Sequence, residues 1–305
     1  MNKRDLITLE NMSRREIFHI LKLARKLKKN PLLRKNAFKY KTLALLFQKP
    51  SNRTRISFEV AMVHLGGYVL YLSPREIEMG RRETVKDVGL VLSRYVDGIV
   101  ARVYSHQDVA DLARYSQVPV INGLSDHAHP CQAMSDVFTI VEKKRSFRSV
   151  KLAYVGDGNN VLNSLLWACA KTGISMNVAA PEGYGPPADL FEETSKIAKK
   201  NRAVFTLSND PREAVAGCDM VYTDVWTSMG CEDEREKRLK DFSGFQVNER
   251  LMQAVGKDAL IMHCLPAHRG EEISDVIDSK NSIVYDQAEN RMHVQKAILL
   301  RMLGG

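Results

Sequence analysis

Cysteine is scarce in this sequence, which has five among its 305 residues, an odd number with no short repeated spacing. Small secreted domains rely on many paired cysteines, and structural zinc sites need closely spaced Cys or His ligands. The pattern therefore argues against a disulfide framework and against a zinc site. It favours a reducing compartment.

Long apolar runs are also missing. None approaches the ~20 residues that a helix needs to cross a bilayer, so we expect no membrane span and no membrane partner. Residues 1–10 alternate charged and apolar side chains and lack the apolar centre of a signal peptide. These absences predict a cytoplasmic protein.

Negative charge is in short supply, with 36 Asp and Glu against 45 Lys and Arg and a formal net charge of +9. Such a balance permits binding of nucleic acid or of small anions. Much of the excess lies in amphipathic stretches such as 22–29 and 196–202, which are typical of solvated helix faces. No zinc finger or RNA-binding signature accompanies them, so we expect no nucleic-acid partner.

Short apolar runs alternate with amphipathic segments along the whole chain, and this alternation predicts the fold. A charged stretch at 142–149 separates two sets of strands and helices. We therefore expect an α/β protein of two doubly wound parallel-sheet domains with the active site in the cleft between them. The last predicted elements are a helix at 271–278, a strand at 282–286 and a helix from 288.

One polar cluster follows the first predicted strand, 42–47. Pro50 suits the middle of neither a strand nor a helix, so Ser51, Arg53 and Thr54 fall at a helix N-terminus, with Arg55 beside them. Unpaired N–H groups and the helix dipole favour an anion there, and guanidinium groups match the geometry of phosphate. The cluster therefore predicts a phosphate site.

Two further segments place reactive side chains after predicted strands. His129 and Gln132 lie about one helical turn apart at a helix start, where the imidazole could donate a hydrogen bond to a developing oxyanion. Cys264 follows a strand beside His263, and we expect its thiol to contact substrate without attacking it. A buried structural cysteine and a histidine used as a helix cap are the alternatives.

The sequence does not decide the function of two loops in the second half of the chain. The turn around Gly156 and Gly158 lacks the third glycine of a dinucleotide fingerprint, so a tight turn that presents Asn159 or Asn160 is favoured over a nicotinamide site. Asp224, before the loop 225–230, could pair with an ammonium group. A solvated loop is an equally good interpretation of that segment.

Taken together, these motifs make the chain resemble the carbamoyltransferase (transcarbamylase) family, and within it the members that act on ornithine. The resemblance runs nearly end to end. It rests on 51–55, Arg102, 129–132, Asn160, Asp224 with 228–230, 263–266 and Arg291.

The resemblance implies a role for each matched residue, with Arg102, His129, Cys264 and Arg291 as the catalytic set. It implies that residues 1–145 bind carbamoyl phosphate, that 146–287 bind ornithine, and that the helix 288–305 returns to the first domain. The carbamoyl phosphate ligands would be Ser51, Asn52, Arg53, Thr54, Arg102, His129, Gln132, Cys264 and Arg291. The ornithine ligands would be Asn160, Asp224, Ser228, Met229, Cys264 and Leu265.

The implied reaction transfers the carbamoyl group to the δ-amine of ornithine and gives citrulline and phosphate, in arginine biosynthesis or in arginine breakdown. The implied partners are carbamoyl phosphate, ornithine and further copies of the chain, as a homotrimer or a multiple of trimers. No cofactor and no metal is implied. Aspartate-specific members typically have His-Pro-Leu-Pro at 263–266, so Cys264 stands where they have proline. This difference and the loop 228–230 favour ornithine over aspartate; putrescine and acylated ornithine are the other candidate acceptors.

Overall fold

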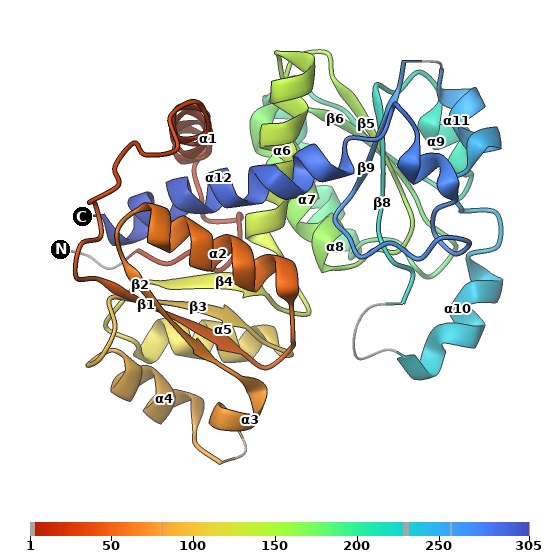
Figure 1. The fold of residues 1–305 in the computed structure, drawn as a ribbon. Helices are drawn as coiled ribbons and strands as arrows, with labels where there is room; N and C mark the ends of the chain where they lie inside the picture. The colour runs from red at the N-terminus through yellow and green to blue at the C-terminus, as the bar shows by residue number, and fades with distance from the viewer. Residues whose placement is uncertain (1–3, 81, 228–231, 257, 305) are drawn as a thin grey trace. The chain divides into compact units, whose positions relative to one another are not determined.

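The computed structural model describes residues 4–80, 82–227, 232–256 and 258–304, and it divides the chain into two compact units. The first unit takes the chain up to Ser135 and again from Asn290, and the second comprises Asp136 to Glu289. Each unit has a parallel sheet of its own, which confirms the predicted pair of parallel-sheet α/β domains (Figure 1). Within the described ranges, no helix is both long and apolar enough to span a bilayer.

The sheet of the first unit has four strands in the order β2-β1-β3-β4. Helices α4 and α5 cover one face of it, and α2 and the end of α12 lie over the other (Figure 1). The strands are β1 (Thr42–Phe47), β2 (Tyr68–Leu72), β3 (Gly98–Arg102) and β4 (Val120–Leu124). The helices are α1 (Arg14–Lys29), α2 (Asn52–His64), α3 (Pro74–Ile77), α4 (Val85–Leu92), α5 (His106–Tyr115) and α6 (Pro130–Lys144), which continues into the second unit.

The sheet of the second unit has five strands in the order β7-β6-β5-β8-β9. Helices α9 and α11 pack their apolar residues against one face of it, and α7 and α8 pack together beside the sheet. The strands are β5 (Lys151–Val155), β6 (Ser175–Ala179), β7 (Phe205–Ser208), β8 (Met220–Thr223) and β9 (Leu260–His263). The helices are α7 (Asn160–Thr172), α8 (Ala188–Lys200), α9 (Pro211–Val215), η1 (Glu232–Glu234), α10 (Arg235–Asp241), α11 (Glu249–Val255) and η2 (Asp275–Asp278). The last helix, α12 (Val284–Leu303), begins in the second unit and belongs to the first from Asn290 onward.

Two predicted elements are wrong. The expected strand at 282–286 is a single bridge between Ser282 and Ile261, because α12 already begins at Val284. The expected helix at 271–278 is a turn followed by one short 3₁₀ segment, η2. In both places the apolar residues are buried against the second unit without a regular period, so their spacing is a poor guide to local structure.

The closing piece of the first unit is the end of α12. Lys296 is buried there, and its ammonium group donates to the carbonyl of Pro31 across 2.7 Å. Burial lowers the pKa of this lysine from its ordinary value. Farther along, Lys41 donates to the carbonyl of Leu303 at 2.8 Å.

The turn between β5 and α7 is held by close backbone contacts. The N–H of Gly158 donates to the carbonyl of Tyr184 across 2.8 Å. A Cβ atom added to Gly158 would lie 2.4 Å from the backbone of Gly185, closer than real Cβ atoms come to other heavy atoms. Glycine is therefore required here for close packing against the protein's own backbone.

We expect Gly158→Ala to lower the free energy of unfolding by about 3 kcal/mol, because neither backbone can yield without distorting the turn. Gly185→Ala is the matched control. A Cβ atom at that position meets only Leu207 at 3.8 Å, an ordinary contact. Urea unfolding of both variants tests the argument, and equal midpoints would contradict it.

Candidate functional site

The N-terminus of α2 forms the first part of the site. Ser51 is the N-cap residue, and its hydroxyl accepts the N–H of Thr54 across 3.3 Å. No acidic residue lies in the first turn, so the positive end of the helix dipole is not compensated from within the helix. Asn52 is exposed and Arg53 is half-buried at this end.

Several polar side chains of the first unit are almost fully buried near this helix end. Thr54 is 1% exposed, Arg102 6% and Arg291 4%. Arg291 donates to the hydroxyl of Thr54 across 2.7 Å, which links α12 to α2 within the unit. His129 and Gln132 lie at the start of α6, one turn apart, and both are buried as well.

Burial and the nearby positive charges determine the protonation state of His129. Burial, and then the positive charges of Arg291 and Arg102, hold the pKa of His129 well below its usual range. The imidazole is therefore neutral near pH 7, and a neutral imidazole can still donate one hydrogen bond. The structure thus brings together two buried guanidiniums, a neutral imidazole and a hydroxyl, a set suited to an anion that carries a carbonyl group.

The side chain of Arg55 contacts other residues than those of this cluster. Its guanidinium forms an ion pair with Glu59 across 2.9 Å and stacks over the ring of Tyr71, 3.8 Å from the ring centroid. The structure therefore assigns Arg55 a role at the surface of α2 and not among the predicted donors to an anion.

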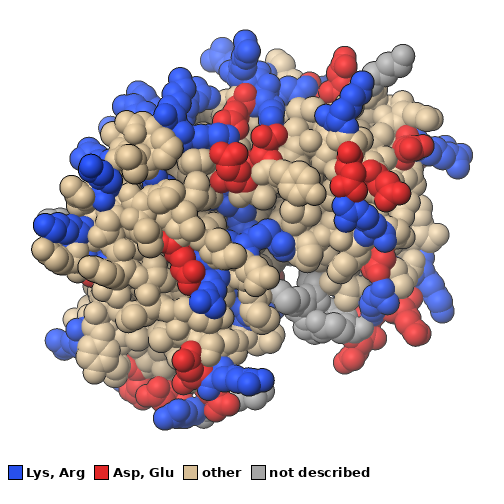
Figure 2. All heavy atoms as spheres, in the orientation of Figure 1, with Lys and Arg blue, Asp and Glu red and all other residues tan. Residues whose placement is uncertain are grey.

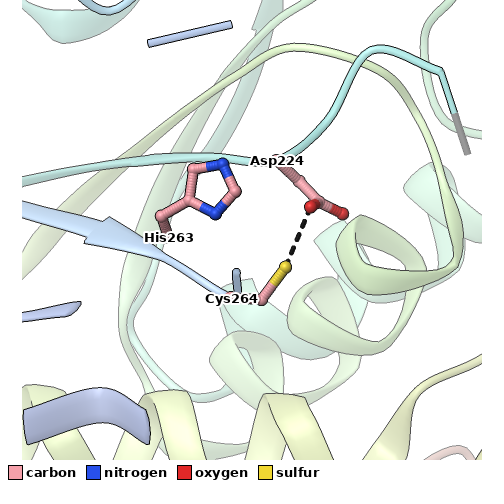
Figure 3. A group of neighbouring side chains, drawn as sticks. All are labelled: Asp224, His263 and Cys264. Atoms are coloured by element: carbon pink, nitrogen blue, oxygen red, sulfur yellow. Dashed lines mark hydrogen bonds between the residues drawn. The ribbon is translucent and has the colours of Figure 1, made fainter. Parts of the chain in front are cut away.

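The second unit gathers Asp224 and Cys264 at the carboxyl ends of β8 and β9 (Figure 3). The thiol of Cys264 donates to Oδ1 of Asp224 across 2.9 Å. Asn159, the N-cap residue of α7, donates its side-chain amide to Oδ2 at 2.8 Å. Asp224 is thus a buried acceptor held from two sides, and it is suited to an ammonium group.

The sequence leaves open whether Asn159 or Asn160 is presented by this turn, and in the structure Asn159 bonds to Asp224. The resemblance points to its neighbour Asn160, which is the first residue of α7. The available signal was Asn immediately before an apolar helix, because that position usually carries the N-cap.

His263 lies beside Cys264 but makes other hydrogen bonds (Figure 3). Its Nδ1 accepts the N–H of Leu265 across 2.9 Å, so the proton must be on Nε2. That nitrogen donates to Oε1 of Glu272 across 3.2 Å. The ligand atoms of Asp224, His263 and Cys264 lie within 4.8 Å of one another, yet both ring nitrogens are already used, so the group is a hydrogen-bonded unit and not a ready metal site.

The turn around Gly156 and Gly158, considered above as a possible nicotinamide site, forms contacts with other parts of the protein. The amide of Gly158 donates to Tyr184, and the side chain of Asp157 contacts Arg238 of α10 across 3.1 Å. Arg238 also donates to the carbonyl of Trp226 at 2.8 Å. The Gly158 N–H, a backbone donor of the kind that a pyrophosphate needs, is thus already used within the protein, which argues against a nicotinamide site.

Two predicted ornithine ligands, Ser228 and Met229, lie outside the described residues. The remaining predicted residues are all described. On the face drawn in Figure 2, many Lys and Arg side chains lie over α1, whose last turn carries Lys26, Lys28 and Lys29. Their position on a helix surface agrees with the solvated faces expected from the sequence.

The ion pair of Asp157 generates a prediction about pH. Burial raises the pKa of the Asp157 carboxyl to about 6, against the opposing effect of Arg238. The folded protein therefore holds this proton more tightly than the unfolded chain, whose Asp pKa is about 3.9, and the contribution to stability falls as pH rises from about 4 to about 6.

The amide of the Asp157→Asn variant does not titrate, so the variant does not lose this contribution to stability as the pH rises. The stability of the variant relative to wild type should rise by on the order of 2–3 kcal/mol between pH 4 and pH 7, whatever the constant offset from the lost ion pair. Urea unfolding across this pH range measures the difference, with the exposed Asp189→Asn as control. Parallel profiles for Asp157→Asn and wild type would refute the prediction.

Two family models match successive parts of the chain. The model of the aspartate/ornithine carbamoyltransferase carbamoyl-P binding domain matches residues 4–142, and that of the Asp/Orn binding domain matches 148–302. The chain is 53% identical over 305 residues to a curated ornithine carbamoyltransferase from Pyrococcus abyssi, with 99% of this chain and 96% of the relative covered. The curated anabolic ornithine carbamoyltransferase of Pyrococcus furiosus is also 53% identical, over 99% of this chain and 97% of its own length.

Solved structures agree with the sequence relatives. The ornithine carbamoyltransferase structure from Pyrococcus furiosus matches with a TM-score of 0.96 and 52% identity, covering 99% of this chain and 98% of that one. The Thermus thermophilus structure of the same name matches with a TM-score of 0.89 and 45% identity, covering 99% and 100% of the two chains. With both domain models matched in order along nearly the whole chain, this protein belongs to the aspartate/ornithine carbamoyltransferase family.

Proposed function

We propose that this protein transfers the carbamoyl group of carbamoyl phosphate to the δ-amine of ornithine and releases citrulline and phosphate. The observation that carries the proposal is the buried cluster of Arg102, Arg291 and neutral His129, which matches an anionic carbonyl compound. The names of the relatives and the two domain models give the same substrates.

The first unit supplies the groups for carbamoyl phosphate. In this proposal Ser51, the backbone of Asn52, Arg53, Thr54 and Arg102 hold the phosphate at the N-terminus of α2. His129 donates a hydrogen bond to the carbonyl oxygen while Arg291 places positive charge beside it. Gln132, one turn along α6 from His129, faces the same group. Because the imidazole is neutral, its role is that of a hydrogen-bond donor that keeps its proton.

The second unit supplies the groups for ornithine. Asp224 pairs with the α-ammonium group, and Asn160, Ser228 and Met229 bind the rest of the amino-acid end. The Cys264 sulfur and the Leu265 carbonyl orient the δ-amine. Asn159 acts through Asp224, because its amide fixes one carboxylate oxygen.

The reaction then follows from placement and charge. The neutral δ-amine attacks the carbamoyl carbon, a tetrahedral intermediate forms, and the bond to the phosphate oxygen breaks. The departing phosphate takes the proton of the amine, so no protein base is needed. Arg53 and Arg102 stabilise the leaving group, while His129 and Arg291 stabilise the developing oxyanion.

Citrulline formation from carbamoyl phosphate tests the proposal directly. Parallel assays with ornithine, aspartate, putrescine and acetylated ornithine as acceptors should show turnover chiefly with ornithine. A preference for any of the other three would replace the proposed acceptor and leave the carbamoyl phosphate half intact.

We expect Arg53→Ala to lower the turnover rate by ~10²–10³-fold, because one charge-assisted donor to the leaving phosphate is lost. Arg15→Ala, on the exposed face of α1, is the control and should keep full activity. Steady-state kinetics of the two variants decide the point, and near-normal turnover by Arg53→Ala would remove this residue from the site.

We expect Cys264→Ser to retain measurable activity, since a hydroxyl can still donate to Asp224 and the thiol is no covalent nucleophile. The thiol proton already points at a carboxylate, a poor arrangement for generating a thiolate. Mass spectrometry of the wild-type protein mixed with carbamoyl phosphate is the complementary measurement. A carbamoyl adduct on Cys264 would contradict this role.

We also propose that the chain assembles as a homotrimer or a multiple of trimers in the cytoplasm. Ile56 and Val63 on α2 and Tyr68 and Leu70 on the edge strand β2 are large apolar side chains that the first unit leaves exposed. Light scattering should give a multiple of three chain masses, and Tyr68→Glu should shift the protein toward single chains. A monomeric wild-type protein would exclude this assembly.

A further inference from the structure

The turn that follows β9 brings one histidine and two glutamates together. Gly270 has a φ of +92°, which favours glycine, and its N–H donates to the carbonyl of Ile273 across 2.9 Å. The N–H of Glu271 donates to the carbonyl of His268 at 3.0 Å. The turn therefore returns Glu271 and Glu272 to the side of His268, although all three belong to one short segment.

The three side chains surround a common point. Nδ1 of His268 lies 3.9 Å from Oε2 of Glu271 and 3.8 Å from Oε2 of Glu272, and the three ligand atoms lie within 4.8 Å of one another. Metal–ligand bonds of about 2.1 Å hold two ligands about 3.0–3.4 Å apart. The two histidine–glutamate separations need to close by about 0.4–0.9 Å to coordinate one ion, and the two carboxylates already lie within 4.8 Å of each other.

Glu272 supplies an independent indication of a ligand. It is 0% exposed, and its Oε1 accepts from Nε2 of His263 and from the N–H of His268, at 3.2 and 2.5 Å. Its other oxygen, Oε2, is buried and has no hydrogen-bond partner among the described residues. A buried carboxylate oxygen without a partner is costly, and this one is directed at His268 and toward Glu271.

The neighbouring groups leave room for a cation. His268 has 49% of its side chain exposed, so an ion can reach Nδ1 from solvent. Glu271 uses Oε1 in an ion pair with Arg235 of α10 and presents Oε2 to the histidine. Arg235 is therefore a basic neighbour whose charge would compete with a bound ion for Glu271.

We propose that His268, Glu271 and Glu272 form a binding site for a divalent transition-metal ion. One imidazole and two carboxylates suit Mn²⁺, Co²⁺ or Zn²⁺, and the exposed side of the site leaves positions for water. The bound ion takes Oε2 of Glu272, while Oε1 continues to accept from His263. The site is distinct from the Asp224 and Cys264 pair, because the ring of His263 is committed to its own hydrogen bonds.

Cobalt is the probe that separates this site from the thiol. Full-length protein treated with a chelator is titrated with CoCl₂, and the visible spectrum and the heat of binding are recorded. One ion should bind without a sulfur-to-cobalt charge-transfer band. Binding should also raise the thermal midpoint of unfolding, because the ion binds the folded chain.

The variants test each ligand. His268→Ala changes an exposed side chain and should fold, and Glu272→Gln keeps an acceptor for His263. Each should weaken cobalt binding by more than the ~10-fold that loss of an outer-shell partner typically costs. Arg235→Gln should tighten binding, since it removes the competing guanidinium. His19→Ala, an exposed histidine on α1, and Cys264→Ser should bind as wild type does.

Three results would overturn the proposal. The first is no cobalt binding by the wild-type chain. The second is unchanged binding by His268→Ala, with circular dichroism confirming its fold. The third is loss of binding in Cys264→Ser together with a charge-transfer band in the wild type, which would move the ion to the thiol.

Discussion

The burial of two guanidinium groups in one small region is the constraint on which the first unit depends. Arg102 and Arg291 are both nearly inaccessible to water, and neither can lose its charge. Both charges act on His129, so the fold must hold two like charges near one another in a poorly hydrated region. The helix dipole of α2 adds to the same field. Under the proposed function, a multiply charged anion would meet this positive field at the N-terminus of α2.

The same field explains the state of His129. A residue placed by sequence alone could serve as a general acid, a base or a hydrogen-bond donor. Burial, and then the two neighbouring cations, lower the pKa of His129, so its imidazole is neutral near pH 7 and can donate one hydrogen bond. In the second unit a negative charge is surrounded by donors, because Asp224 accepts from both Cys264 and Asn159.

Much of the fold could be predicted because local signals agreed with it. The strand 42–47 and the helix beginning beside Ser51 follow from an apolar run, a proline and a capping serine, and the structure has β1 and α2 there. The region from 271 to 286 could not be predicted in the same way, since its apolar residues are buried by tertiary contacts without a period. A capping hydroxyl or an apolar residue predicts local secondary structure only when the groups it contacts are near neighbours in the sequence.

At the candidate site, too, some features could be predicted from the sequence and others could not. The residue types at the anion cluster could be identified, but the side-chain directions could not, and Arg55 illustrates the difference by its pairing with Glu59. Asn159 and Asn160 are adjacent and chemically identical, so only the start of α7 decides which of them reaches Asp224. The bond from His263 to Glu272 depends on a turn whose shape the composition of the segment does not reveal.

The first unit is assembled from two distant stretches of the chain, and this has a consequence during synthesis. Asp136 to Glu289 leave the ribosome as one uninterrupted stretch, so the second unit can fold as soon as it emerges. The first unit must wait, with part of its sheet uncovered, until Arg291, Lys296 and Leu303 arrive to contact Thr54, Pro31 and Lys41. The contact between Arg291 and Thr54 is therefore completed only after the other unit has been made, so the first unit is the later of the two to finish folding.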